Sequence, residues 1–214
     1  MTDELLEKLR GSLLELDKEA TLEAVRAVLQ EGSAHAEAGV RAVTDALDRV
    51  GRLFQEGDWF LGELVYAGEI AKQAMELLSP HLSAGADKRL GTVVVGTVQG
   101  DMHDLGKNIF ITYAQSAGFE IVDLGTDVTV EQFAEAALEH QPLALGMSCL
   151  LTVSAGAIGR VIEGLDRRGV RESVKVIVGG AALTEEFAHE VGADAFAPDA
   201  VTGTGIIRAW SQGR

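Results

Sequence analysis

The stretch LGTVVVGTVQGDMHDLGKNIF, Leu90–Phe110, indicates a strand–turn–helix unit at the start of the second part of the chain. Its first half is rich in β-branched residues and ends at Gly100, as expected of a buried strand. The chain then passes through Asp101, His103 and Gly106 before a helical pattern begins. A buried strand that delivers a histidine flanked by carboxylates to the start of a helix is typical of a functional site.

Beyond this stretch, short apolar runs alternate with helical patterns as far as the C-terminus. This alternation indicates βαβ units and a parallel sheet covered on both faces. We predict a Rossmann-like, flavodoxin-like α/β domain with five parallel strands. The predicted strands are Thr92–Val98, Glu120–Leu124, Leu143–Met147, Val174–Val178 and Ala193–Ala197, and the predicted helices are Gly106–Ala117, Val130–His140, Ala155–Arg168, Glu185–Val191 and Gly203–Trp210.

The preceding part of the chain has the apolar spacing of helices. Four helices joined by short turns predict a four-helix bundle. The domains are then a helical bundle over residues 1–86 and an α/β domain over 87–214, with the boundary within Ser83–Arg89. The bundle helices are predicted at Asp3–Leu16, from the cap Asp17 to Leu29, at Val40–Phe54, and from Trp59 to Leu78 before Pro80.

The junction LFQEGDWFLGELV, residues 53–65, holds more apolar residues than one helix face can bury. Two interpretations stay open from spacing alone. The residues form the core and pack against the second domain, or they form an apolar lid over a bound group. The residues concerned are Phe54, Trp59, Phe60, Leu61, Leu64 and Val65.

Composition excludes several classes of partner. The chain has 214 residues and a formal net charge of −15, which argues against nucleic acid or anionic lipid as the main partner. No apolar run approaches the ~20 residues of a membrane span, and the start MTDELLEKLRG lacks the layout of a signal peptide. Cys149 is the only cysteine, so an internal disulfide is excluded. We expect a soluble cytoplasmic protein.

Unusual residues follow four of the predicted strands. They are the loop GDMHDLG at residues 100–106, the run Ser148–Ser154, the pair Gly179-Gly180 and the segment Ala197–Asp199. Open parallel sheets bind ligands at the carboxyl ends of their strands, next to the topological switch point. We therefore predict the functional site at this edge of the sheet.

Several kinds of chemistry can be compared at this edge. A phosphate-binding P-loop is excluded, because five residues instead of four separate Gly100 from Gly106 and Asn108 replaces the required hydroxyl. A zinc hydrolase needs three or four ligands, and the chain has only five histidines. Nucleophilic catalysis by Cys149 or Ser148 with His103 as base lacks an oxyanion-hole signature.

His103, with Asp101 two residues earlier, is better interpreted as one axial metal ligand oriented by a carboxylate. One protein ligand suffices when a macrocycle supplies the remaining coordination. Gly106 would then let the chain pass close to a bulky ligand, and Gly179-Gly180 would leave room beside the sheet. An ordinary tight turn explains Gly179-Gly180 equally well.

These residues resemble the cobalamin-binding domain of methionine synthase and of corrinoid methyltransferase proteins. The shared signature is D-x-H-x-x-G, then S-x-L, then G-G. It is present here as Asp101-Met102-His103-Asp104-Leu105-Gly106, Ser148-Cys149-Leu150 and Gly179-Gly180. The helical part, GRLFQEGDWFLGELVYAGEIAKQAMELLSP, is similar to the helical cap of the same family, although Gly62 replaces a proline that is frequent there.

The resemblance implies that cobalamin binds base-off with His103 as the lower cobalt ligand. The residues Asp101–Gly106 would contact the cofactor, and the nucleotide tail would pass Ser148, Leu150, Thr152 and Gly179-Gly180. A serine at the position of Ser154 would complete a relay with Asp101 and His103. The cap residues over the methyl-bearing face would be Phe54, Leu61, Leu64 and Val65.

The function implied is that of a methyl carrier cycling between cobalt(I) and methyl-cobalt(III). A substrate-specific methyltransferase would load the methyl group, a second one would pass it to an acceptor such as tetrahydrofolate or a thiol, and a reductive activating protein would restore cobalt(I). With no room for a catalytic barrel, the chain is expected not to be catalytic alone.

Two alternatives remain within the resemblance. A B12-dependent photosensor would carry a W-x9-E-H pattern, which Trp59 and Glu69 fit but Ile70 breaks, and a DNA-binding module for which residues 1–30 are too short and acidic. The small subunit of an adenosylcobalamin mutase shares the cobalamin domain but does not need this cap.

Overall fold

The computed structural model describes residues 2–32, 35–81 and 90–213. The chain forms two compact units, Met1–Lys88 with Ser116–Gly118 and Arg89–Gln115 with Phe119–Arg214. The predicted boundary segment, Ser83–Arg89, lies outside the described residues.

The first unit is a bundle of helices. α1 packs on α2 and α3, and α4 packs on the same two helices, so the four surround one core. Its fully buried side chains include Leu9, Leu13, Val25, Leu64 and Leu78. The helices are α1 (Thr2–Leu14), α2 (Lys18–Gln30), α3 (Ala36–Gln55) and α4 (Leu61–Leu78), followed by the 3-10 turn η2 (Ser79–His81).

Helix α4 begins two residues later than the apolar spacing predicted. Phe60 is the N-cap residue in an extended conformation, and its N–H donates to the carboxylate of Glu63 at 2.7 Å. Because this cap fixes the start of the helix, Trp59 and Phe60 precede it.

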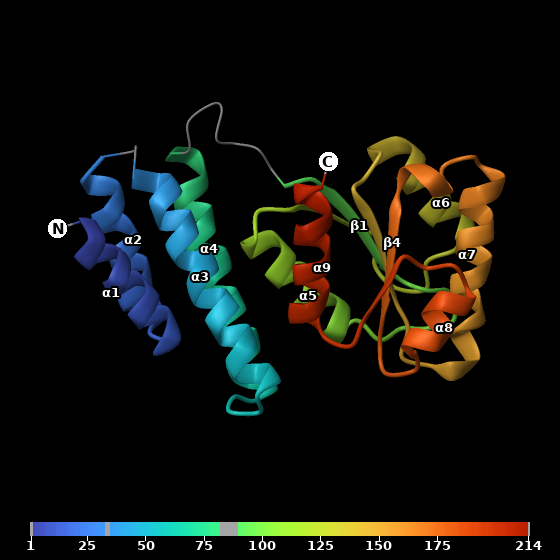
Figure 1. Cartoon of the computed structure of the whole chain (residues 1–214), viewed down its shortest axis with the longest axis horizontal. Helices are drawn as coiled ribbons and strands as arrows, with labels where there is room; N and C mark the ends of the chain where they lie inside the picture. The colour runs from blue at the N-terminus through green and yellow to red at the C-terminus, as the bar shows by residue number, and fades with distance from the viewer. Residues whose placement is uncertain (1, 33–34, 82–89, 214) are drawn as a thin grey trace. The chain divides into compact units, whose positions relative to one another are not determined.

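The second unit is a five-stranded parallel sheet with the strand order β2-β1-β3-β4-β5, which is the flavodoxin-like order. The predicted parallel α/β fold is confirmed. Figure 1 shows α5 and α9 on one face of the sheet and α6, α7 and α8 on the other. The strands are β1 (Thr92–Thr97), β2 (Glu120–Asp123), β3 (Ala144–Ser148), β4 (Lys175–Gly179) and β5 (Ala195–Ala197).

The helices of this unit follow the strands in alternation, and polar side chains cap several of them. Asp199 caps α9 through the N–H of Thr202 at 2.8 Å, so α9 begins three residues before the predicted start at Gly203. The helices are α5 (Leu105–Ser116), α6 (Val130–His140), α7 (Gly156–Arg167), α8 (Glu185–Glu190) and α9 (Ala200–Gln212), with 3-10 turns η3 (Thr152–Ser154) and η4 (Arg171–Ser173).

The two faces of the sheet differ in packing. Val94, Leu145 and Val176 belong to a buried core that includes side chains of α6 and α7. The alternate residues in register across β1, β3 and β4, which are Val95, Gly146 and Ile177, line a pocket instead. Of the helices described, none combines the length and apolar character needed to cross a membrane.

Candidate functional site

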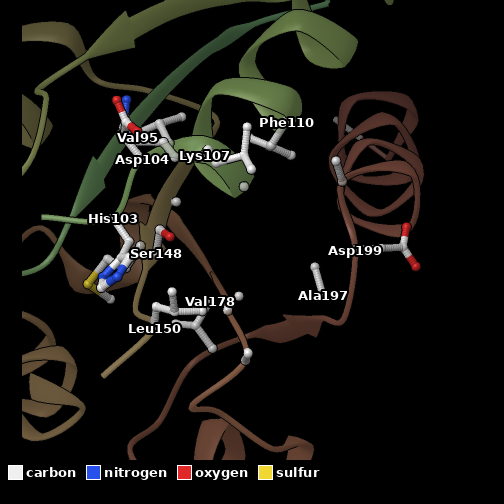
Figure 2. A pocket seen from close by; sticks show the side chains of 18 of the residues that line it. Val95, His103, Asp104, Lys107, Phe110, Ser148, Leu150, Val178, Ala197 and Asp199 are labelled. Carbon is white, nitrogen blue, oxygen red and sulfur yellow. The ribbon is translucent and has the colours of Figure 1, made fainter. Parts of the chain in front are cut away.

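The pocket lies at the carboxyl edge of the sheet and has a volume of about 550 Å³. Its walls are the loop after β1, the first turns of α5, the ends of β3 and β4, and the segment that enters α9. Figure 2 shows Lys107 and Phe110 of α5 along one side and Ala197 and Asp199 across from them. The pocket therefore lies at the carboxyl edge of the sheet, next to the topological switch point, where the sequence predicted the functional site.

Small residues in register open the floor of the pocket. Ser148 of β3 pairs with Gly179 of β4, which in turn pairs with Ala197 of β5. Gly180 follows in a left-handed conformation, with φ +126°, and a Cβ there would overlap the carbonyl oxygen of Cys149. Only glycine fits this backbone, so the turn itself accounts for Gly180.

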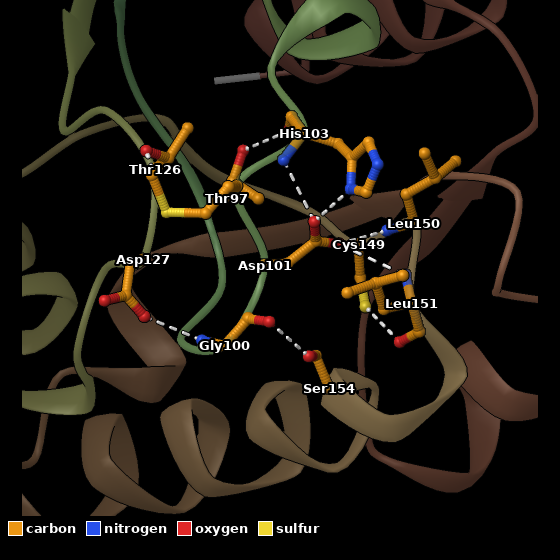
Figure 3. Close-up of polar contacts among 11 residues, drawn as sticks. Thr97, Gly100, Asp101, His103, Thr126, Asp127, Cys149, Leu150, Leu151 and Ser154 are labelled. Carbon is orange, nitrogen blue, oxygen red and sulfur yellow. Dashed lines mark hydrogen bonds and ion pairs between the residues drawn. The ribbon is translucent and has the colours of Figure 1, made fainter.

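The carboxylate of Asp101 is fully buried and accepts four hydrogen bonds. Its Oδ1 accepts from the backbone N–H and from Nδ1 of His103, at 3.0 and 2.7 Å, and its Oδ2 accepts from the N–H groups of Leu150 and Leu151, at 2.5 and 3.1 Å. Figure 3 shows these contacts converging on one side chain. Burial alone would raise the pKa of Asp101, but the hydrogen bonds outweigh it and lower the pKa to about 2.

The imidazole of His103 is consequently held in one orientation. An anionic carboxylate accepts from Nδ1, so the proton of the neutral ring lies on Nδ1 and the lone pair lies on Nε2. The side chain of His103 is 53% exposed and lines the pocket. Among the described residues no protein group is hydrogen-bonded to Nε2. This nitrogen is thus presented to a ligand.

Three further hydrogen bonds hold the backbone of residues 100–103 around the histidine. The hydroxyl of Thr97 donates to the carbonyl of His103 at 3.0 Å. Asp127 accepts from the N–H of Gly100 at 2.7 Å and donates its own N–H to the carbonyl of Asp101 at 3.1 Å. These hydrogen bonds from neighbouring segments thus hold the loop that carries the histidine.

Ser154 contacts this loop differently from the predicted relay. Its hydroxyl donates to the carbonyl of Gly100 at 2.9 Å. Both oxygens of Asp101 are occupied by other donors, and within the described part of the chain no hydrogen bond joins Ser154 to that carboxylate. The serine thus holds the peptide that precedes Asp101.

Most of the other predicted cofactor-binding residues of this unit line the pocket. Gly106 faces open space, since a Cβ built on it meets nothing within 4 Å. Thr152 is exposed in η3 and does not line the pocket. The predicted residues that line it are Met102, His103, Asp104, Leu105, Gly106, Ser148, Leu150, Gly179 and Gly180.

The predicted cap residues belong to the first unit and differ in exposure. Leu61 and Val65 of α4 are 43% and 39% exposed, and Phe54 of α3 is half-buried. Leu64 is 1% exposed and lies in the bundle core. The apolar excess of the junction therefore divides into the core residue Leu64, the half-buried Phe54 and Trp59, and the exposed Phe60, Leu61 and Val65.

Sequence reasoning missed the apolar walls of the pocket, chiefly Val95, Phe110 and Ile177. For Val95 and Ile177 the signal was present in the alternation along the strands, because residues two positions apart in a strand lie on the same face. It was ambiguous, since both faces of a parallel sheet are apolar.

Lys107 was also missed, and it is buried beside the pocket. Its Nζ donates to both carboxylate oxygens of Asp123 at 2.7 and 2.9 Å, and to the amide oxygen of Asn108 at 2.9 Å. This ion pair ties the first turn of α5 to the end of β2.

Fold and site together define a ligand-binding α/β protein with one metal-competent imidazole above an apolar pocket. This donor set suits a metal whose other ligands come from a macrocycle. The family described as "B12 binding domain" matches residues 91–205, and a second family of the same description matches residues 5–79. The chain belongs to the B12-binding family, and cobalamin is its cofactor.

Similar proteins agree with this assignment. The dimethylamine corrinoid protein 3 of Methanosarcina acetivorans is 39% identical over 196 residues, which cover 92% of each chain. A cobalamin-binding protein of Desulfitobacterium hafniense has a TM-score of 0.85 at 36% identity, covering 96% of this chain and 98% of its own. The methanol:cobalamin methyltransferase complex of Methanosarcina barkeri contains a chain with a TM-score of 0.80 at 26% identity, with 99% and 81% covered. The predicted family, corrinoid proteins of methyltransferase systems, is confirmed.

Proposed function

We propose that this chain is a corrinoid methyl carrier that receives a methyl group from one methyltransferase and delivers it to another. Relatives named as dimethylamine corrinoid proteins and a structural relative from a methanol methyltransferase complex support this class. They favour it over the photosensor and the mutase subunit. A methylamine, methanol or a related methyl compound is the proposed donor class, and tetrahydrofolate or a thiol the proposed acceptor.

The observation that carries the proposal is the geometry of His103. Its Nδ1 is bound to a buried carboxylate, and the side chain is 53% exposed, which leaves Nε2 available to a ligand. Cobalamin supplies a cobalt centre that accepts and releases a methyl group. His103 would ligate this cobalt from below through Nε2, and Asp101 would increase the basicity of the imidazole by accepting its other N–H.

The pocket below His103 would hold the nucleotide tail displaced by the imidazole. Its lining is mainly apolar, with Val95, Phe110 and Ile177, which suits an aromatic base, and Gly106 leaves open space beside it. The contact between Ser154 and Gly100 would hold the backbone of Asp101 in place when His103 binds or leaves the metal.

The exposed apolar residues at the start of α4 would cover the reactive face of the cofactor. Phe60, Leu61 and Val65 are 78%, 43% and 39% exposed, more than a bundle that acts only as a scaffold requires. An apolar cover excludes water and oxygen, and it must move away when a methyltransferase engages the same face.

Methyl transfer to the loaded chain tests the proposed function. The chain reconstituted with cobalamin and reduced to cobalt(I) is mixed with a methylamine and the matching methyltransferase, and methylation of cobalt is followed by absorbance. We expect methylation that depends on the methyltransferase and is faster than that of free cobalamin. Equal rates for free and bound cobalamin with every methyltransferase tested would contradict the proposal. A reductive activator is proposed to restore chains whose cobalt has been oxidised.

A further inference from the structure

Thr97 is the last residue of β1, and its side chain is fully buried. Its backbone is paired with the segment that follows β2, because its N–H donates to the carbonyl of Gly125 at 3.0 Å and its carbonyl accepts from the N–H of Val128 at 2.9 Å. Only the hydroxyl reaches the histidine loop, where it donates to the carbonyl of His103 at 3.0 Å. Among the described residues, Thr97 thus supplies the side-chain hydrogen bond from the end of β1 to His103.

Thr97 and Asp101 hold opposite ends of the same residue. Asp101 binds the N–H and the imidazole of His103, and Thr97 binds its carbonyl, as Figure 3 shows. We propose that Thr97 is a positioning residue that sets the place of Nε2 relative to the metal, an inference that rests on His103 as the lower ligand. It acts through His103 and does not itself contact the metal.

If Thr97 positions His103, its hydroxyl should affect coordination of cobalt, whereas a purely structural role would affect only the stability of the fold. Coordination of cobalt requires Nε2 of His103 to be placed accurately. Folding of the chain requires only that the loop form, and it tolerates small shifts of the imidazole. Without the hydroxyl, the carbonyl end of His103 can move while Asp101 still holds the ring. The equilibrium between histidine-bound and histidine-free cobalt should then shift by about tenfold towards the free form, which is the size of one hydrogen bond.

Two variants of Thr97 and one control isolate the hydroxyl. Thr97→Val keeps the shape and the β-branch and removes the donor, and Thr97→Ser restores the donor. Thr204→Val is the matched control, since Thr204 is also buried and its hydroxyl donates to a backbone carbonyl, that of Ala200 at 2.8 Å. Thr204 does not contact the histidine loop, so its loss affects the fold but not the metal ligand.

The measurement is the electron paramagnetic resonance spectrum of bound cob(II)alamin in chains prepared with ¹⁵N-histidine, in which splitting by a histidine nitrogen is distinguished from splitting by the ¹⁴N of the cofactor's own base. Melting temperatures of the cobalamin-free chains are recorded alongside. We expect the ratio of histidine-bound to histidine-free cobalt to fall about tenfold in Thr97→Val and to stay unchanged in Thr97→Ser and Thr204→Val. The two valine variants should have similar melting temperatures.

Any other result overturns either the positioning role of Thr97 or the role of His103 as the ligand. An unchanged ratio in Thr97→Val overturns the positioning role, as does an equal fall in Thr204→Val or a failure of serine to restore the ratio. If Thr97→Val does not fold, Thr97→Ala is measured in its place. Absence of ¹⁵N-histidine splitting in the unaltered chain would instead overturn His103 as the ligand, so the two failures are distinguishable.

Discussion

At the scale of single residues, the Asp101 carboxylate decides how the histidine is presented. Three backbone N–H groups and one imidazole N–H point at its two oxygens. Such a cluster of donors stabilises an anion and disfavours any group that itself donates. The buried carboxylate is therefore required both for the local fold and for the tautomer of His103.

Replacing Asp101 with asparagine should destabilise the cobalamin-free chain. The amide NH₂ would face two of the four donors and leave them unpaired, at a cost of about 2–4 kcal/mol in the free energy of unfolding. Urea unfolding followed by circular dichroism measures this cost.

Asp127→Asn is the matched control. Its amide oxygen can still accept from Gly100, and asparagine tolerates the left-handed conformation of residue 127, with φ 55°. We expect a change below about 1 kcal/mol. Equal destabilisation by the two substitutions would contradict the role assigned to the donors around Asp101.

The sequence was sufficient to predict His103, Asp101 and their place after β1, because a strand, a turn and a helix start follow directly from local pattern. It did not predict what Ser154 contacts. The choice between the Asp101 carboxylate and the Gly100 carbonyl depends on where η3 packs, and this is set by tertiary contacts. The hydroxyl of Thr97 was missed for the same reason, since threonine in a strand has an ordinary explanation.

At the scale of elements, α4 combines two roles that the apolar pattern could not separate. Leu64 packs in the bundle, while Leu61 and Val65 are exposed three residues before it and one residue after it. Helical periodicity identifies the apolar face of α4. It does not show which residues of a wide apolar face are buried by the other helices of the bundle. The late start of α4 also depends on the Glu63 cap, which the pattern alone did not indicate.

Substitutions in α4 should therefore separate stability from protection of the cofactor. Leu64→Ala should lower the free energy of unfolding by about 2–5 kcal/mol because it opens a cavity. Leu61→Ala should change stability by less than about 1 kcal/mol and accelerate photolysis of bound methylcobalamin. Unfolding curves and photolysis rates under fixed illumination measure the two effects. Unchanged photolysis in Leu61→Ala and in Phe54→Ala would return these residues to a packing role.

The far end of β4 carries a charge cluster that should make stability depend on pH. Asp194 accepts from the N–H of Val176 at 2.8 Å and pairs with Arg171 and Lys175 at 2.9 and 3.0 Å. Burial would raise the pKa of Asp194, but these contacts outweigh it and lower the pKa below its ordinary value. The stabilisation is thus present above the unfolded pKa of about 4 and is lost as pH falls through the lowered value.

Asp194→Asn should consequently reduce stability at pH 7 by about 1–2 kcal/mol and by less as the pH falls below about 4. Urea unfolding at a series of pH values measures this dependence. Asp166→Asn, at an exposed position on α7, is the control and should follow the unaltered chain. A constant difference between Asp194→Asn and the unaltered chain at all pH values would contradict the assignment.

At the scale of the whole molecule, the chain combines a helical bundle with an α/β unit. His103 and the pocket belong to the second unit, and the exposed apolar residues of α4 belong to the first. The change of periodicity near residue 90 was enough to predict the two folds. Under the proposed function a partner methyltransferase binds the methyl donor, so no residue of this chain needs to recognise the donor and the sequence does not identify it.

The spectrum of bound cob(II)alamin in histidine-labelled protein tests whether His103 ligates cobalt. The chain is prepared with ¹⁴N- or ¹⁵N-histidine, loaded with cobalamin and reduced to cobalt(II). We predict nitrogen hyperfine splitting that changes with the isotope in the unaltered chain and does not change with it in His103→Ala. A splitting that is the same for both isotopes in the unaltered chain, or that still depends on the isotope in His103→Ala, would contradict His103 as the ligand of cobalt.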